Sequence, residues 1–405
     1  MKRITFLLIL ISQIIFSQNN KNDDINKMKK DVTYLSADKL KGRKTGSPGE
    51  KKAAKYIIQQ FERNGLLKKG DNGYLQEFKK TIKRNPHSSI KTKEINGANV
   101  IGYCNNNQDK TIIIGAHYDH LGYGDFGSLH KGEKDIHNGA DDNASGVSVL
   151  INLVNRLCAN QFYNYLFISF SGEEQGLLGS SYFSENPTID LSTVKFMINF
   201  DMVGRLNQNN ELAINGVGTS SKWNDLITST NKYFNCKLIK SESGTGPSDH
   251  TAFYLKNIPV LHFFTGQHED YHKPSDDVEK INFEGMYTIM SFVDTLINYS
   301  SRIENFDFQE TEHETKKISQ FKVTLGIMPN YLYDGNGLKI DGVTKNKTAY
   351  KSGLLKGDII VKMGDTKVKD IYDYMKALGH FSQNDSTIII INRNGEEISI
   401  AIKFE

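Results

Sequence analysis

Runs of apolar residues recur along the N-terminal part of the chain and predict the strands of one central sheet. The run over residues 111–116 is unbroken, which is typical of a strand that is buried on both faces. Apolar residues at helical spacing predict helices over residues 51–66, 147–157 and 283–300. The other predicted strands cover residues 99–103, 165–170, 195–200 and 258–264. Because helical and strand patterns alternate, we expect an α/β fold with a mostly parallel or mixed twisted sheet flanked by helices.

The pattern changes after residue 302. Residues 303–317 are rich in charged residues, His and Thr and lack an apolar period, so they are predicted to be a solvated linker. Short strand-like runs then surround one predicted helix over residues 371–378, which indicates a small β-rich domain over residues 318–405. Its predicted strands cover residues 324–328, 338–343, 358–363, 387–392 and 397–403.

Residues 1–17 have the pattern of a secretory signal peptide. Lys2 and Arg3 precede an apolar stretch over residues 4–16, which a polar run follows. This stretch is too short for a stable membrane anchor, and no later stretch is long and apolar enough to span a bilayer. We therefore expect an exported periplasmic or extracellular protein whose main domain covers residues 25–302.

Composition and cysteine content narrow the class of protein. The 405 residues are 38% hydrophobic and 24% charged, which is near average for globular proteins. The net charge of +3 gives no reason to expect nucleic acid as a partner. The three cysteines, Cys104, Cys158 and Cys236, exclude a disulfide scaffold and allow one bridge at most. Because Cys158 lies in an apolar helical run, we expect free buried thiols.

Acidic and His residues follow the predicted strands closely. His117 and Asp119 follow the strand over residues 111–116, and Asp201 follows the strand over residues 195–200. In open α/β sheets, sites form at the carboxyl ends of the strands, so these groups should meet in one crevice. Imidazoles and carboxylates are zinc ligands, and one carboxylate can bridge two ions. The candidate ligands are His117, Asp142, Glu174, Asp201 and His272, and the adjacent Glu173 is the candidate general base.

The segments that carry these side chains resemble the co-catalytic zinc exopeptidases of clan MH, which include bacterial leucyl aminopeptidases and glutamate carboxypeptidases. Order and spacing match over roughly residues 30–300. The matching segments are Gly115-Ala116-His117-Tyr118-Asp119, Gly139-Ala140-Asp141-Asp142-Asn143-Ala144-Ser145-Gly146, Ser171-Gly172-Glu173-Glu174-Gln175-Gly176, Asn199-Phe200-Asp201-Met202 and Tyr271-His272.

The resemblance implies two zinc ions per chain and assigns their ligands. Asp142, rather than Asp141, bridges both ions, because the bridging Asp of the family lies three residues before the Ser of the Ser-Gly pair. His117 and Asp201 hold one ion, and Glu174 and His272 hold the other. The peptide bond after Asp142 is implied to be cis.

Three further residues are expected near the site. Asp119 is expected to accept a hydrogen bond from the imidazole of His117 and thereby fix its tautomer. Asp276 has two interpretations, either the same role for His272 or a helix cap. His250 also has two, either a substrate or oxyanion contact or an ordinary residue at a helix start.

Residues 318–405 resemble a PDZ domain. The resemblance rests on Leu325-Gly326-Ile327-Met328 and on residues 349–360. It implies a sheet edge that an extended peptide or a protein C-terminus joins as a further strand. The alternative is a domain that only packs against the catalytic domain.

The sequence thus predicts a secreted zinc aminopeptidase that removes N-terminal residues from peptides with a free N-terminus. A metal-bound hydroxide attacks the first peptide carbonyl, and Glu173 takes up the proton. The alternatives are a glutaminyl cyclase or a carboxypeptidase of the same fold, or a non-catalytic protein that binds peptides through its C-terminal domain.

Overall fold

The structure is a computed structural model that describes residues 21–82, 93–311, 323–329, 333, 335–343, 346–369 and 371–404. The chain divides into two compact units, Met1–Thr311 and Glu312–Glu405, each with an apolar core of its own. The expected signal peptide over residues 1–17 lies outside the described residues.

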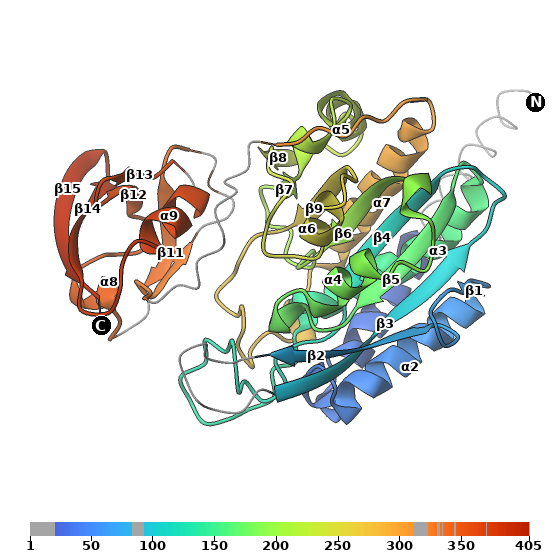
Figure 1. Cartoon of the computed structure of the whole chain (residues 1–405), viewed down its shortest axis with the longest axis horizontal. Helices are drawn as coiled ribbons and strands as arrows, with labels where there is room; N and C mark the ends of the chain where they lie inside the picture. The colour runs from blue at the N-terminus through green and yellow to red at the C-terminus, as the bar shows by residue number, and fades with distance from the viewer. Residues whose placement is uncertain are drawn as a thin grey trace, which may run out of the picture. The chain divides into compact units, whose positions relative to one another are not determined.

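One mixed sheet forms the centre of the first unit (Figure 1). Its strands are β1 (Leu67–Lys68), β2 (Leu75–Ile82), β3 (Lys93–Cys104), β4 (Thr111–His117), β5 (Asn164–Phe170), β6 (Val194–Phe200), β7 (Glu211–Asn215), β8 (Lys237–Ser241) and β9 (Val260–Phe264). They are ordered β1-β3-β5-β4-β6-β9-β7-β8, and β2 pairs with β3. The strands β5, β4, β6 and β9 are parallel, whereas β3 and β7 pair antiparallel to their inner neighbours.

Helices cover both faces of this sheet. The helical segments are residues 21–35, α2 (Pro48–Arg63), α3 (Gly146–Asn160), α4 (Leu178–Glu185), α5 (Trp223–Asn231), α6 (His250–Tyr254) and α7 (Phe283–Ser300). Ile112 and Ile114 of β4 share one core with α2, α3, α5 and α7, whereas Ile113 shares the opposite core with α4 and α6. Strand β4 is therefore buried on both faces, and the predicted α/β class is confirmed.

The register of the parallel strands determines where their carboxyl ends lie. His117, the last residue of β4, is level with Phe170, the last residue of β5, and Gly115 is level with Asn199 of β6. The residues that follow β4, β5 and β6 therefore emerge at the same edge of the sheet.

The second unit is a small antiparallel domain. It contains β10 (Ile327–Pro329), β11 (Leu338–Val343), α8 (Thr348–Lys351), β12 (Ile359–Met363), β13 (Thr366–Lys367), α9 (Ile371–Leu378), β14 (Ser386–Arg393) and β15 (Glu396–Lys403). The strand order is β10-β11-β12-β14-β15, and β13 pairs with β12. The buried Asp358 accepts two hydrogen bonds from the guanidinium of Arg393, at 2.6 and 2.7 Å. The predicted β-rich domain is thus present.

Two segments differ from the expectation. Residues 207–246, for which the sequence pattern predicted no helix or strand, contain β7, α5 and β8. Residues 303–311, part of the expected solvated linker, pack against the first unit. Phe306 lies 4.6 Å from Trp223 and 5.1 Å from Phe196 between ring centroids, and the hydroxyl of Tyr254 accepts a hydrogen bond from the Thr311 N–H. The aromatic residues among these charges explain the difference, because they cover the core.

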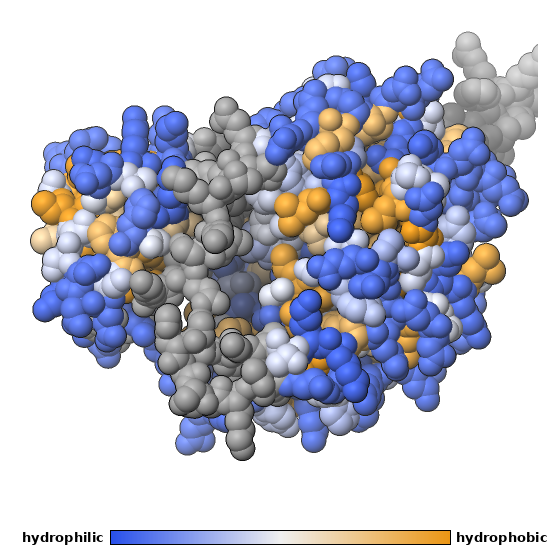
Figure 2. Space-filling view, viewed as in Figure 1, coloured by the Kyte–Doolittle hydropathy of each residue, from blue (hydrophilic) through white to orange (hydrophobic). Residues whose placement is uncertain are grey.

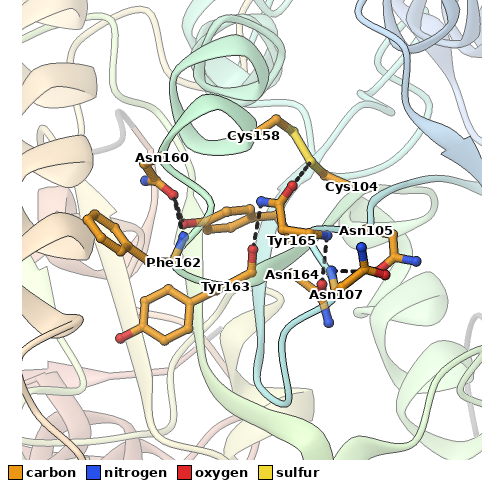
Figure 3. The surroundings of a disulfide bond; sticks show 10 residues. Cys104, Asn105, Asn107, Cys158, Asn160, Phe162, Tyr163, Asn164 and Tyr165 are labelled. Atoms are coloured by element: carbon orange, nitrogen blue, oxygen red, sulfur yellow. Dashed lines mark hydrogen bonds between the residues drawn. A yellow bond between two sulfur atoms is a disulfide. The ribbon is translucent and has the colours of Figure 1, made fainter.

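The cysteines also differ from the expectation of free thiols. Cys104 at the end of β3 and Cys158 in α3 form a disulfide, with their Cα atoms 6.0 Å apart (Figure 3). Cys236 is free and buried. The bridge joins the sheet to a helix on its face, a proximity that comes from the tertiary fold and not from local sequence.

The exposed surface is mixed in character. On the face drawn in Figure 2, hydrophilic residues predominate and hydrophobic ones are interspersed among them. None of the described helices combines the length and the apolarity that a bilayer crossing requires.

Candidate metal centre

A first cluster forms where β4, β6 and the start of α3 meet. It consists of His117 at the end of β4, Asp201 directly after β6, and Asp142 in the helical turn Ala140–Ser145 that leads into α3. The Nε2 atom of His117 lies 3.2 Å from Asp201 Oδ1 and 3.3 Å from Asp142 Oδ1. The imidazole and both carboxylates therefore converge on one point, as metal ligands do.

A second cluster shares Asp142 with the first. The Nε2 atom of His272 lies 3.3 Å from Asp142 Oδ2 and 3.2 Å from Glu174 Oε2. His120 joins this cluster, with its Nδ1 atom 2.7 Å from Glu174 Oε1 and 3.8 Å from Asp142 Oδ2. Asp142 thus presents one oxygen to each cluster, and the Asp142–Asn143 bond is cis, as the resemblance implies.

These donors fit zinc. Imidazole nitrogens and carboxylate oxygens are its usual ligands besides thiolates. Among the described residues, the buried His120 Nδ1 and Glu174 Oε1 have no hydrogen-bond partner, although they lie 2.7 Å apart. Two buried polar atoms of these types that approach each other so closely are suited to share a cation.

In both clusters, the buried carboxylates and imidazoles shift one another's pKa values. Burial alone would raise the pKa of Asp142, but the imidazoles of His120, His117 and His272 hold it well below its usual range. Burial likewise opposes ionisation of Glu174, yet His272 lowers its pKa to about 2. Conversely, burial would lower the pKa of His117, but Asp201 raises it well above the usual value. The neighbouring imidazoles thus stabilise Asp142 and Glu174 as anions.

Glu173 lies beside these clusters at the start of the short helical turn Glu173–Gln175. Burial raises its pKa well above the usual range, His117 opposes that effect, and Asp201 and Glu174 add to it. Its backbone N–H donates to Asp119 Oδ1 at 3.1 Å. A carboxyl group with a raised pKa is suited to take up a proton and to return it later in a reaction.

The expected partners of the two ligand imidazoles are different in the structure. Nδ1 of His117 faces the backbone carbonyl of Asp119 at 3.3 Å, while the nearest carboxylate oxygen of Asp119 lies 3.8 Å away. Nδ1 of His272 faces the carbonyl of Gly127 at 2.8 Å. Asp276 instead accepts hydrogen bonds from the backbone N–H groups of Asp141 and Asp142, at 3.0–3.1 Å. It therefore holds the turn that carries the shared ligand.

His250 lies apart from both clusters. It is fully buried and stacks on His262 with ring centroids 4.5 Å apart, and burial holds its pKa well below the usual value. The contact with the metal centre comes from Ser248, whose hydroxyl donates to Asp201 Oδ2 at 2.8 Å.

Sequence reasoning missed two residues of the site. One is His120, although its place three residues after His117 in the same strand-end loop was a usable signal. The other is Asp141, which accepts from the Gly204 N–H at 2.6 Å and lies 3.1 Å from His268 Nε2. No spacing pattern indicated those two partners.

Two family models match parts of the chain. Residues 99–297 match the family model described as Peptidase family M28, and residues 317–404 match that of the PDZ domain. A probable leucine aminopeptidase of Trichophyton verrucosum is 27% identical over 233 residues, which are 53% of this chain and 61% of that protein. The chain thus spans less than two thirds of this relative's length.

Solved structures show the fold. The zinc aminopeptidase BSAP of Bacillus subtilis is 18% identical with a TM-score of 0.55, covering 71% of this chain and 98% of that one. The glutaminyl cyclase of Bacteroides thetaiotaomicron, bound to N-acetylhistamine, is 18% identical with a TM-score of 0.53, covering 67% and 97%. The first unit therefore has the fold of zinc exopeptidases, and both activities occur on it.

Proposed function

We propose that the first unit is an aminopeptidase that holds two zinc ions. The observation that carries this proposal is the position of Asp142, whose Oδ1 lies 3.3 Å from His117 Nε2 and whose Oδ2 lies 3.3 Å from His272 Nε2. A carboxylate shared between two ligand clusters is suited to a two-metal hydrolytic site. His117, Asp142 and Asp201 would hold one zinc, and Asp142, Glu174 and His272 would hold the other, with His120 as a further donor.

The chain's own residues supply the proton transfers. When bound, zinc lowers the pKa of water and polarises the carbonyl of the scissile bond. Glu173 takes the proton that the water loses as its oxygen bonds to the carbonyl carbon. The same carboxyl group then gives this proton to the departing amine as the C–N bond breaks, and Glu173 returns to its starting state.

Glutaminyl cyclase activity is the second candidate, because a glutaminyl cyclase is similar in fold. The two-cluster arrangement around Asp142 favours hydrolysis, for which both ions have a role. A carboxypeptidase would need a free C-terminus on its substrate, and a non-catalytic binding protein would show no turnover at all.

One assay separates these functions. The chain from residue 18 onwards is loaded with zinc and incubated with amino-acid arylamides, N-acetylated peptides, and peptides that begin with glutamine. We expect release of N-terminal residues from substrates with a free amine only, loss of this activity with a chelator, and recovery on addition of zinc. Ammonia release without hydrolysis would indicate the cyclase, and residues released from the C-terminus would indicate a carboxypeptidase.

We further propose that residues 1–17 direct export. The Cys104–Cys158 disulfide supports this location, because such bonds persist mainly in oxidising compartments. Determining the N-terminal residue of protein recovered from the periplasm or the medium tests it. An N-terminus at Met1 would contradict cleavage.

For the second unit we propose a peptide-docking role. Gly326 is in the left-handed region, with φ of 73°, in the segment that precedes β10. Such a segment can present backbone N–H groups to a terminal carboxylate. The ligand of this unit would then be a peptide or protein with a free C-terminus.

A further inference from the structure

Residues 43–50 contact the loops that carry His117, Asp142 and Glu174, although they precede the segment that matches the peptidase family. Arg43 is buried, and its guanidinium donates to four backbone carbonyls. These are the carbonyls of Tyr118 at 2.9 Å, Leu35 at 2.5 Å, Asn138 at 2.7 Å and Gly139 at 3.0 Å. Tyr118 follows the ligand His117, and Gly139 begins the turn that carries Asp142, so one side chain ties two ligand loops together.

The backbone around Arg43 is fitted closely between these loops. A Cβ atom on Gly42 would lie 2.5 Å from the carbonyl oxygens of both Gly122 and His137, so only glycine fits there. The Gly122 N–H donates to the Gly42 carbonyl at 2.9 Å, and the His120 N–H donates to the Arg43 carbonyl at 3.3 Å. The segment thus also holds the loop that carries His120.

A second contact reaches the proposed base. The Thr45 hydroxyl donates to Asp119 Oδ2 at 2.7 Å, and Asp119 Oδ1 accepts the backbone N–H of Glu173 at 3.1 Å. Asp119 is fully buried. Thr45 and Glu173 are therefore linked through one carboxylate whose two oxygens each have a fixed donor.

A third contact lies next to the second. The buried Glu50 accepts hydrogen bonds from the Ser171 hydroxyl and, at 2.5 Å, from the Gly46 N–H. Ser171 lies two residues before Glu173. At the same place, Ser47 caps α2 by accepting the Glu50 N–H at 3.2 Å. The start of α2 is thereby attached to the loop that follows β5.

We propose that residues 43–50, the N-terminal clamp, position the metal centre through two separate routes. Arg43 is a positioning residue for the ligand loops and so sets metal affinity. Thr45 is a positioning residue for Glu173, acting through Asp119, and so sets the rate of proton transfer. The second route rests on the proposed function, whereas the first concerns metal binding alone.

The Thr45 route is tested with a matched pair of variants. Thr45→Val removes the hydroxyl at nearly constant shape, and Thr45→Ser keeps it. We expect Thr45→Val to retain zinc content and KM while kcat falls about 10–100-fold, which is the usual effect of losing a hydrogen-bond partner of a site residue. Thr45→Ser should keep most of the wild-type kcat. Equal kcat for Thr45→Val and wild type, or a loss that Thr45→Ser does not restore, would overturn this route.

The Arg43 route is tested by metal binding, without reference to activity. Lysine at position 43 carries one ammonium, which cannot reach four carbonyls that a planar guanidinium spans. We expect Arg43→Lys to weaken binding of Zn²⁺ and Co²⁺ about 10–100-fold in competition with a chelator, and to change the visible spectrum of the Co²⁺-loaded chain.

Arg156→Lys is the matched control, because Arg156 is partly buried and pairs with Asp24 and Asp294 instead of contacting a ligand loop. It should retain the wild-type cobalt spectrum. An Arg43→Lys variant with wild-type metal affinity and spectrum would overturn the route, as would an equal change in Arg156→Lys. If Arg43→Lys fails to fold, Arg43→Gln, which keeps two donors, is measured in the same way. A wild type that binds Co²⁺ but lacks aminopeptidase activity would refute the proposed function and leave the metal-binding test intact.

Discussion

Replacing Asp142 with asparagine changes the one side chain that both clusters share, and we expect it to weaken the two zinc sites unequally. Asparagine keeps the shape of the side chain but removes its charge and one ligand oxygen. Besides the neutral amide oxygen, which can serve one cluster at most, the first cluster retains two donors, His117 and Asp201. The second cluster retains three, Glu174, His272 and His120.

The size of the effect follows from the number of ligands. A structural zinc site with four protein ligands binds with about 10–16 kcal/mol, so one ligand contributes roughly 3 kcal/mol, or about two orders of magnitude in affinity. The first cluster should show this loss fully, because only two donors remain. The second should lose less, because His120 keeps its donor count at three.

The assay is zinc content per chain after dialysis against a graded series of chelator concentrations. Wild type should release two zinc ions, and Asp142→Asn should release both at lower chelator, the ion of the first cluster earlier. Asp201→Asn and Glu174→Gln are the matched controls, because each touches one cluster and should weaken one ion only. A wild type that saturates at one zinc, or an Asp142→Asn variant with two ions of unchanged affinity, would refute the reasoning.

Three further outcomes are expected. Glu173→Gln should keep both zinc ions and lose roughly 10²–10⁴-fold in kcat, because an amide cannot take up a proton. Burial and Asp119 raise the pKa of Glu50 from 4.5 to about 8, so the folded chain keeps a proton that the unfolded chain releases. The contribution of Glu50 to the free energy of unfolding is therefore full below about pH 4.5 and is lost as the pH rises toward 8. In urea denaturation, Glu50→Gln should make the free energy of unfolding depend less on pH over this range. A chain that ends at Thr311 should fold and cleave arylamides, whereas one that ends at Arg302 should melt at lower temperature because it lacks Phe306.

Each of these outcomes has a contrary result. Near-full turnover of Glu173→Gln would show that Glu173 is not the base, and a urea midpoint of wild type that does not fall from pH 5 to 8 would contradict the buried neutral Glu50.

The chain that ends at Thr311 also separates two roles of the second unit. Docking predicts that only long peptides are cleaved more slowly, and shielding predicts that bulky substrates are cleaved faster. An equal loss of activity on short and long substrates, with zinc retained, would contradict both the docking role and the shielding role.

The central strands could be predicted because their pattern is local. Residues 111–116 form an unbroken apolar run, and the structure buries this run on both faces of the sheet. The parallel register then brings the residues that follow each strand to one edge, so that His117 and Asp201 meet although they are far apart in sequence. Strand β7, which lies between β9 and β8, was missed because a short strand of mixed polarity has no distinct period.

The cysteine pairing and the role of residues 303–311 could not be read from local pattern. Cys104 and Cys158 are 54 residues apart and meet only because α3 packs on the sheet. Phe306 lies in a charged stretch, and its burial depends on Trp223 and Phe196, which belong to α5 and β6. Both contacts are decided by packing, which single-sequence periodicity does not describe.

The hydrogen-bond partners of the site residues were also not predictable from local sequence. The spacing of Asp119 and His117 suggested a hydrogen bond between them, but Nδ1 of His117 faces the Asp119 backbone carbonyl and does not need the carboxylate. The buried N–H of Glu173 and the hydroxyl of Thr45 lie beside that carboxylate, and an unpaired buried donor costs about 1–3 kcal/mol. The carboxylate therefore pairs with the donors that would otherwise be unsatisfied, and these come from other loops. The positions of the metal ligands could be predicted because they follow the ends of the strands. The hydrogen-bond partners of these ligands could not, because they depend on which buried donors from other loops still lack an acceptor.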